Sequence, residues 1–296
     1  MTDAVRIVEV GPRDGLQNEA VAVSPASRIA FVEKLLAAGL TTIEVGSFVS
    51  PKWVPQMAGT DVVLKSLGVR DGIDFPALVP NEKGLEAAIA AGAREVAIFA
   101  AASEAFSHKN INCSIAESIE RFRPVADRAL AAGIRVRGYV SCVLGCPYQG
   151  EVPMAAVVAV TRVLHELGCY EISLGDTIGT GTPVKARDLV RAVSGAVPVG
   201  ALAVHYHDTY GQALANLYTA LEEGVRVVDA AAGGLGGCPY ATGASGNVAT
   251  EAVVYMLDGM GVRTGVDMPK LLDAVAFITG ALGRGPQSNV YRAMRG

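Results

Sequence analysis

Stretches with the hydrophobic pattern of helices alternate along this chain with stretches that have the composition of strands. An alanine-rich stretch with helical periodicity ends at a glycine, and a short run rich in β-branched residues follows it. This unit occurs five times, as AAGLTTIEVGS, AAGAREVAIFA, AAGIRVRGYVS, ELGCYEISLGD and EEGVRVVDAAA. Its glycines stand where a helix C-cap favours a residue with positive φ, and they are Gly39, Gly92, Gly133, Gly168 and Gly224. The pattern predicts five helix-to-strand junctions.

Three further runs have the composition of strands, namely Arg6 to Pro12, Asp74 to Pro80 and Ala201 to Asp208. Amphipathic stretches separate the strands. The one from Ser27 to Ala38 places four apolar residues on one face, namely Ile29, Val32, Leu35 and Leu36. Eight strands alternating with helices predict a (β/α)8 TIM barrel. An open doubly wound sheet has the same alternation, but GPRDGLQNE after the first strand lacks the Gly-x-Gly-x-x-Gly of a dinucleotide-binding turn.

Composition narrows the class of protein. A barrel needs roughly 250 residues, and no linker divides residues 1–296, so we expect a single barrel domain. The chain is 51% hydrophobic and 18% charged, which excludes global disorder. A net charge of -4 without basic runs argues against a nucleic-acid partner. The sequence has no apolar run of the roughly 20 residues that span a bilayer, and we expect no cleaved leader. Its five irregularly spaced cysteines favour a cytoplasmic location.

Titratable and other polar residues gather at the ends of the predicted strands. In a parallel barrel these ends meet at one mouth, where active sites lie. The residues are Arg13 and Asp14 after the first strand, Glu44 in the second, Asp176 at the end of the sixth, His205, His207 and Asp208 in the seventh, and Cys238 and Asn247 after the eighth. The sequence therefore predicts an active site at the C-terminal mouth.

The pair His205 and His207 indicates a metal site. Residues two apart in a strand point to the same face, so both imidazoles project together while Tyr206 points away. By itself such a pair is more often structural, but here Asp14 can add an anionic ligand and Asn247 a carbonyl oxygen. A nitrogen and oxygen set without thiolate favours Mg²⁺ or Mn²⁺ over structural zinc.

Other polar residues allow two interpretations each. Arg13 either orients Asp14 or stabilises a developing enolate, and we expect Glu44 and Asp176 to face the lumen and pair with Arg13, the metal or its histidines. Cys238 lies in the glycine-rich stretch Gly233 to Gly246, which we interpret as a lid; its thiol either donates a proton or packs.

The remaining histidines and one cysteine pair give weaker indications of a functional role. We interpret Cys142 and Cys146 as buried thiols and not as metal ligands, because the sequence has no second cysteine pair near them. His165 fits a packing or surface role in a helix. His108 lies in a loop nearer the mouth and is also interpreted as structural, with substrate contact as the alternative.

Seven stretches resemble those of 3-hydroxy-3-methylglutaryl-CoA lyases, a metallolyase group of TIM barrels: VEVGPRDGLQNE, SFVSPKWVPQM, KNINCSI, GYVSCVLGCPY, YEISLGDTIGTGTP, VHYHDTYGQALAN and GLGGCPYATGASGNVATE. The resemblance implies metal ligands at Asp14, His205, His207 and Asn247, catalytic roles for Arg13, Glu44, Asp176 and Cys238, and a substrate contact at Gln17. It also implies a homodimer. The chain ends AMRG and lacks the C-terminal cysteine of animal members, so their thiol regulation does not transfer.

The resemblance implies cleavage of 3-hydroxy-3-methylglutaryl-CoA into acetyl-CoA and acetoacetate, as in leucine degradation and ketone body formation. Asp14 or His205 would accept the hydroxyl proton, Arg13 would steady the enolate oxygen and Cys238 would protonate the carbon. Two alternatives stay open: a related Claisen-type synthase or hydroxy-oxo-acid aldolase, and a metal-binding barrel without activity.

Overall fold

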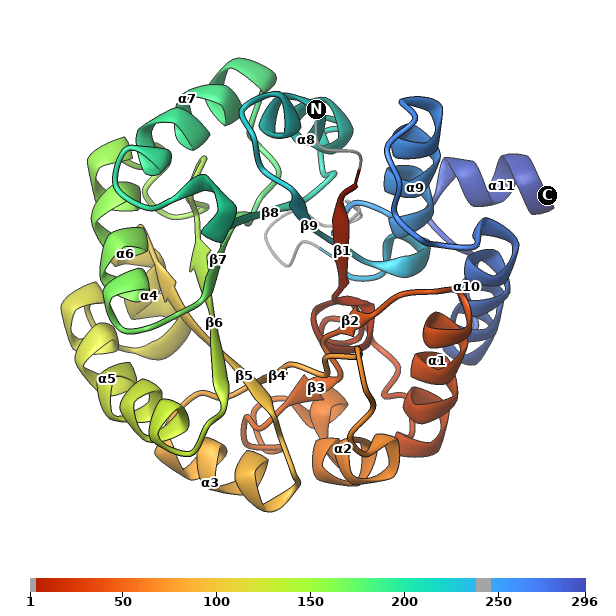
Figure 1. The fold of residues 1–296 in the computed structure, drawn as a ribbon, viewed down its shortest axis with the longest axis horizontal. Coiled ribbons are helices and arrows are strands. Elements are labelled where there is room, and N and C mark those ends of the chain that lie inside the picture. Colours follow the sequence, from red (N-terminus) through yellow and green to blue (C-terminus); the bar gives the residue numbers. More distant parts are fainter. Residues whose placement is uncertain (1–3, 238–245) are drawn as a thin grey trace.

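The computed structural model describes residues 4–237 and 246–296. Within these ranges, parallel strands form one sheet in the order β2-β1-β9-β8-β7-β6-β5-β4-β3. Their bounds are β1 (Arg6–Glu9), β2 (Thr42–Ile43), β3 (Gly46–Ser47), β4 (Ala77–Leu78), β5 (Glu95–Ala101), β6 (Arg135–Ser141), β7 (Glu171–Asp176), β8 (Leu202–Tyr206) and β9 (Val227–Ala230). Figure 1 shows the strands around a central opening, with the helices outside them.

The sheet closes through the segment that contains β2 and β3. β2 pairs with β1, β3 pairs with β4, and only Glu44 and Val45 separate the two. The Glu44 amide donates to the Glu9 carbonyl and the Val45 amide donates to the Pro76 carbonyl, so these two residues also bridge the neighbouring strands. β2 and β3 are therefore two parts of one barrel strand, and the predicted eight-stranded TIM barrel is confirmed.

Helices cover the outside of the barrel. They are α1 (Pro25–Ala37), α2 (Thr60–Leu67), α3 (Glu82–Ala90), α4 (Glu104–Ile111), α5 (Ile115–Ala131), α6 (Met154–Glu166), α7 (Pro183–Ser194), α8 (Ala213–Glu222), α9 (Thr250–Gly259), α10 (Met268–Leu282) and α11 (Asn289–Arg295). Four short turns, η1 (Gly11–Gly15), η2 (Pro55–Met57), η3 (Val199–Ala201) and η4 (Ala232–Gly234), complete the described elements. None of the described helices has the length and apolar character to span a bilayer.

The five predicted junctions exist as expected. Gly39, Gly92, Gly133, Gly168 and Gly224 have φ values of 93°, 87°, 72°, 90° and 98°. In α1 the buried face is centred on Phe31, Val32 and Leu35, while Ile29 and Leu36 are only partly buried. The helix begins two residues before Ser27 because the Ser24 hydroxyl accepts from the Ser27 amide and caps it.

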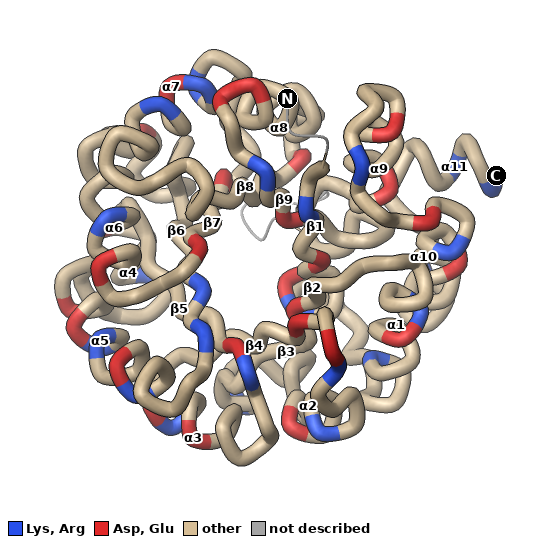
Figure 2. Tube along the Cα trace, in the orientation of Figure 1, with Lys and Arg blue, Asp and Glu red and all other residues tan. Residues whose placement is uncertain are grey.

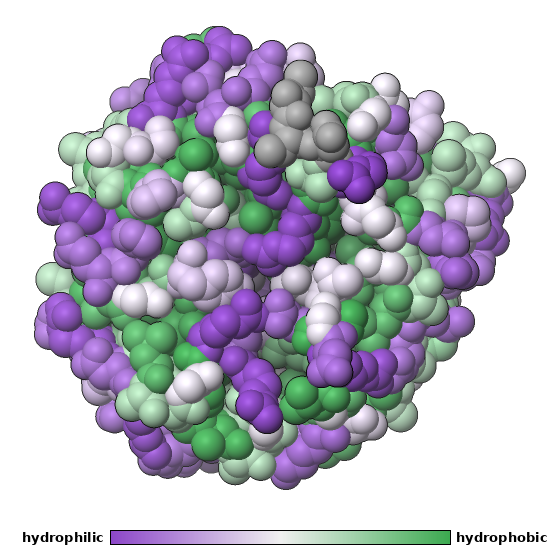
Figure 3. Space-filling model, viewed as in Figure 1, coloured by the Kyte–Doolittle hydropathy of each residue, from purple (hydrophilic) through white to green (hydrophobic). Residues whose placement is uncertain are grey.

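Charged residues lie inside the barrel as well as on its surface. Figure 2 shows Lys, Arg, Asp and Glu positions along the strands around the central opening. At the N-terminal ends of the strands, Arg6, Glu171 and Arg226 line part of an open cavity of about 870 Å³. Figure 3 shows hydrophilic residues over the centre of one face of the molecule. The barrel interior is therefore polar along its axis, and its apolar core lies mainly between strands and helices.

Candidate metal centre

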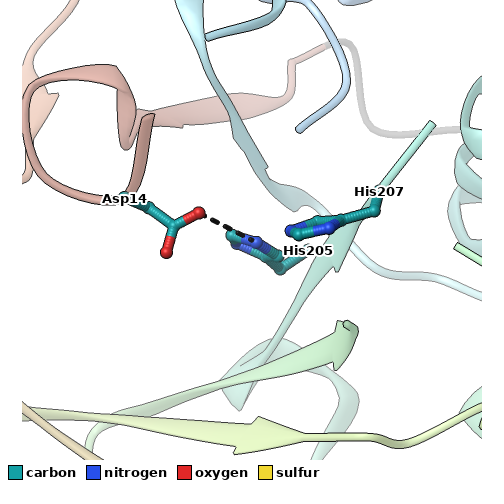
Figure 4. A group of neighbouring side chains, drawn as sticks. All are labelled: Asp14, His205 and His207. Atoms are coloured by element: carbon teal, nitrogen blue, oxygen red, sulfur yellow. Dashed lines mark ion pairs between the residues drawn. The ribbon is translucent and has the colours of Figure 1, made fainter. Parts of the chain in front are cut away.

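Three potential ligands meet at the C-terminal ends of β1 and β8. One side-chain nitrogen or oxygen from each of Asp14, His205 and His207 lies within 4.8 Å of the other two. Asp14 is in η1, which follows β1 directly, whereas His205 is in β8 and His207 comes just after it. Figure 4 shows the Asp14 carboxylate facing the two rings. The predicted convergence of these residues is present.

Asn247 completes the predicted ligand set in space. Its Nδ2 donates to Asp14 Oδ2 at 2.9 Å and to the Leu235 carbonyl at 3.2 Å. A β-bridge pairs Asn247 with His207, and Asn247 is buried. Because the amide nitrogen is engaged by two acceptors, the side-chain oxygen is the atom that can ligate a cation.

The donor set fits a divalent cation. His207 Nδ1 is buried and has no hydrogen-bond partner among the residues the structure describes. Burial, followed by the neighbouring His205, lowers the pKa of His207 to about 4, so its ring is neutral at pH 7 and can ligate. Burial alone would raise the pKa of Asp14, but Arg13 and the two histidines outweigh it and hold that pKa well below its ordinary value. A permanent carboxylate and the neutral imidazole of His207 suit a cation such as Mg²⁺ or Mn²⁺.

Arg13 lies between two carboxylates beside this cluster. Its Nε donates to Glu44 Oε2 at 2.7 Å and its Nη1 donates to Asp14 Oδ1 at 2.6 Å. The Tyr139 hydroxyl also donates to Glu44 Oε2, at 3.0 Å, and the guanidinium lies 5.4 Å from the Tyr139 ring centroid. Glu44 thus pairs with Arg13 in the lumen, as expected. Burial raises the pKa of Glu44, although Arg13 opposes that shift.

Asp176 does not join the cluster, and the expectation that it faces the lumen is wrong. It pairs in register with Tyr206, while its neighbour Gly175 pairs with His205. Because side chains alternate between the faces of a sheet, Asp176 and His205 point to opposite faces. The Asp176 carboxylate instead accepts from the backbone amides of Thr180 and Gly181, which stabilises the loop after β7.

Two other predicted site residues have less structural support. Gln17 follows η1 and is partly buried. Cys238 lies outside the described residues, as does most of the Gly233 to Gly246 segment. The two ends of that segment approach each other, since a Cβ on Gly246 would lie 2.8 Å from the Gly236 carbonyl carbon. A Cβ on Gly236 would lie 3.1 Å from Asn247 Nδ2, so the base of the loop lies against a potential ligand.

The remaining histidines and the cysteine pair, which gave weaker indications of function in the sequence, have no role at the metal cluster. His108 is exposed in α4, 3.9 Å from Glu104, and His165 is partly buried in α6. Cys142 and Cys146 are buried free thiols, as predicted. The Cys146 sulfur accepts from the Ser103 hydroxyl at 3.0 Å.

Sequence reasoning missed the acidic residue behind His205. Asp229 Oδ2 lies 3.2 Å from His205 Nδ1, and Arg137 donates to both Asp229 oxygens. Burial opposes a charged His205 ring, but Asp229 and Asp14 outweigh burial and raise the pKa of His205. The predicted site residues lie at strand ends, whereas Asp229 and Arg137 lie within strands. A charge in the middle of a buried strand is itself a signal, because it needs a partner across the lumen.

Comparison with known proteins identifies the family of this chain. The HMGL-like family model matches residues 4–278. The chain belongs to this family. It is 61% identical over 289 residues to the mitochondrial hydroxymethylglutaryl-CoA lyase of Bos taurus, which covers 98% of this chain and 89% of that protein. It is 57% identical over 290 residues to the 3-hydroxy-3-isohexenylglutaryl-CoA/hydroxy-methylglutaryl-CoA lyase of Pseudomonas aeruginosa, covering 98% of this chain and 97% of that protein.

Solved structures agree with the family assignment. A crystal structure of hydroxymethylglutaryl-CoA lyase from Pseudomonas aeruginosa superposes with a TM-score of 0.97 at 57% identity, covering 99% of this chain and 97% of that one. The carboxyl transferase domain of Rhizobium etli pyruvate carboxylase shares the fold, with a TM-score of 0.72 at 18% identity over 98% of this chain and 50% of that one. The resemblance drawn from the sequence motifs is confirmed. The HMGL-like family is metal-dependent, and Asp14, His205 and His207 form a possible ligand set.

Proposed function

We propose that this chain is a hydroxymethylglutaryl-CoA lyase, which cleaves 3-hydroxy-3-methylglutaryl-CoA into acetyl-CoA and acetoacetate. The observation that carries the proposal is the cluster of Asp14, His205 and His207 within 4.8 Å at the barrel mouth. With Asn247, these residues would hold Mg²⁺ or Mn²⁺. When bound, such a cation lowers the pKa of the substrate's tertiary hydroxyl and orients the bond that breaks.

Different side chains carry out the remaining steps of the reaction. Asp14 accepts the hydroxyl proton, or His205 does so when its Nε2 is not bound to the cation, after which the carbon–carbon bond breaks and a thioester enolate leaves. Arg13 donates hydrogen bonds to the enolate oxygen, and Glu44 fixes the guanidinium from the other side. Cys238 then protonates the enolate carbon to give acetyl-CoA. Cys238 lies outside the described residues; its sequence position two residues after Gly236, which lies against Asn247, supports this role. Gln17 contacts the substrate, and Asp176 acts by holding the loop after β7.

Acetoacetate release from 3-hydroxy-3-methylglutaryl-CoA tests the proposal. We expect product that disappears with EDTA and returns with Mg²⁺ or Mn²⁺. No product with any metal would refute the lyase, and condensation or aldolase assays would then test those activities. Cys238→Ala should retain metal but lose roughly a hundredfold in turnover. Near-normal turnover would remove Cys238 from the mechanism.

We further propose that residues 1–296 act as one domain in a cytoplasmic homodimer that serves leucine degradation and ketone body formation. The four described cysteines are free thiols, as a reducing compartment requires. Sedimentation equilibrium tests the dimer, and a monomer at micromolar concentration would refute it. Growth of a deletion strain on leucine tests the pathway.

A further inference from the structure

The two histidines of the metal centre have different surroundings. His205 pairs in register with Asp229 on β9, and its Nδ1 lies 3.2 Å from Asp229 Oδ2. His207 Nδ1 is buried without a partner among the described residues. One ring is thus fixed from behind by a carboxylate, and the other is not.

The contact with Asp229 determines which His205 nitrogen can ligate. An ionised carboxylate only accepts hydrogen bonds, so His205 Nδ1 must carry the proton. In the neutral ring, the lone pair is then on Nε2. This is the nitrogen that lies 3.9 Å from Asp14 Oδ2, on the side of the other ligands.

Asp229 is itself held by the barrel interior. Arg137 Nη2 donates to Asp229 Oδ1 at 2.7 Å, and the Ser173 hydroxyl donates to Oδ2 at 2.8 Å. The two guanidinium bonds from Arg137 compensate the charge of the Asp229 carboxylate. Arg137 Nε in turn donates to Glu171 at 2.8 Å, and Glu171 pairs with Arg6 at the far end of the barrel. A continuous series of ion pairs therefore runs along the axis up to His205.

We propose that Asp229 is a positioning residue of the metal centre, which fixes the tautomer and ring orientation of His205 so that Nε2 faces the cation. Arg137 holds Asp229 in place and keeps its charge compensated. The inference rests on the proposed metal site. Carboxylates behind ligating histidines contribute about 10- to 100-fold to metal affinity in other proteins, and we expect a loss in that range when Asp229 is removed.

The test is the Mn²⁺ dissociation constant, measured from the EPR signal of free Mn²⁺. Asp229→Ala should weaken binding about 10- to 100-fold. Asp229→Asn keeps an acceptor oxygen and should lose less. Glu95→Gln is the matched control, because Glu95 is a buried strand carboxylate that bonds Arg135 and Tyr170 instead of a ligand, and it should bind Mn²⁺ as the wild type does.

A second measurement needs no variant and remains valid if Asp229→Ala fails to fold. Long-range ¹H–¹⁵N spectra of histidine-labelled wild type, without metal and with Mg²⁺, distinguish the two tautomers, and the chain has 4 histidines to assign. We expect His205 with its proton on Nδ1. A proton on Nε2, or equal Mn²⁺ affinity in wild type and folded Asp229→Ala, would overturn the inference alone. Absence of Mn²⁺ binding by the wild type would instead refute the proposed metal site.

Discussion

Arg13 shows how one buried side chain can serve both structure and chemistry. Its guanidinium is almost fully buried, pairs with Glu44 and Asp14, and is packed near the Tyr139 ring. Burial would lower the pKa of Arg13, but the two carboxylates outweigh it and raise that pKa, so the positive charge is permanent. A fixed charge held on two sides needs little rearrangement when an enolate forms beside it.

Replacing Arg13 should therefore affect turnover more than metal binding. Arg13→Met removes the charge near the developing enolate, and we expect kcat to fall about 100- to 1000-fold. Mn²⁺ affinity should not weaken, because Asp14 loses a competing cation. Arg13→Lys should be intermediate, since one ammonium cannot match the forked geometry that spans both carboxylates. Steady-state kinetics at saturating Mn²⁺ measure this, and a Met variant with wild-type kcat would contradict it.

At the scale of elements, glycines set the angle at which each strand leaves the helix before it. Gly39 and Gly133 both adopt positive φ at such junctions. Their surroundings differ, because a Cβ on Gly39 would lie 2.3 Å from the Gly265 carbonyl oxygen, whereas a Cβ on Gly133 would have no heavy atom within 4 Å. Substitutions at the two positions can therefore be compared to separate the effect of backbone strain from the effect of steric overlap.

Alanine at these two junctions should give different losses of stability. Gly133→Ala should lower the free energy of unfolding by about 1 kcal/mol, the cost of placing a Cβ in left-handed backbone. Gly39→Ala should lose about 1–3 kcal/mol more, because the contacted carbonyl must shift. Urea unfolding of both variants measures the difference. Equal losses would mean that the α1 to β2 junction adjusts freely.

Glu9, the last residue of β1, joins three elements. Its Oε1 accepts from the Gly11 amide of η1 at 2.8 Å and the Ala232 amide of η4 at 2.9 Å, and its Oε2 accepts from the Thr250 hydroxyl of α9 at 2.6 Å. Burial raises the pKa of Glu9 from 4.5 to about 7, even though all three hydrogen bonds oppose the shift. The nearby Glu251 adds to the increase.

This raised pKa predicts a pH dependence of stability. The folded state binds the Glu9 proton more tightly than the unfolded state, so the stabilisation is complete below pH 4.5 and is lost as the pH rises through about 7. Between pH 5.5 and pH 8, Glu9 should lower the free energy of unfolding by about 2 kcal/mol. Glu9→Gln should remove this contribution. Urea unfolding at both pH values tests it, and an unchanged difference in the variant would exclude Glu9 as the cause.

At the scale of the whole molecule, the proposed ligands come from opposite ends of the chain. Asp14 follows β1, and Asn247 precedes α9, so a bound cation would connect the first and last barrel units. Ligands that are close only in the folded chain bind the native state in preference to the unfolded state. Metal should therefore stabilise the entire barrel.

A thermal shift measures this linkage. With free Mn²⁺ at 100 times its dissociation constant, we expect about 2.7 kcal/mol of added stability. For a protein of this size that is a rise in Tm of about 5 °C. Asp14→Asn should lose most of the rise. If EDTA and Mn²⁺ left the wild-type Tm unchanged, binding would not be linked to folding as proposed.

The sequence alone determined the repeating unit, the five glycine junctions and the shared direction of His205 and His207. Each depends on neighbours within a few residues, because helix caps and strand alternation are local properties. The convergence of Asp14, His205, His207 and Asn247 also followed, since strands of a parallel barrel all end at one mouth.

Only the tertiary structure decided what lies beside each strand residue. Register between β7 and β8 directs Asp176 away from the lumen, and register between β8 and β9 places Asp229 behind His205. A shift of one residue would reverse these faces while leaving the hydrophobic pattern of these fully buried strands almost unchanged. Register in a closed barrel depends on the packing of all strands together, which no local stretch of sequence specifies.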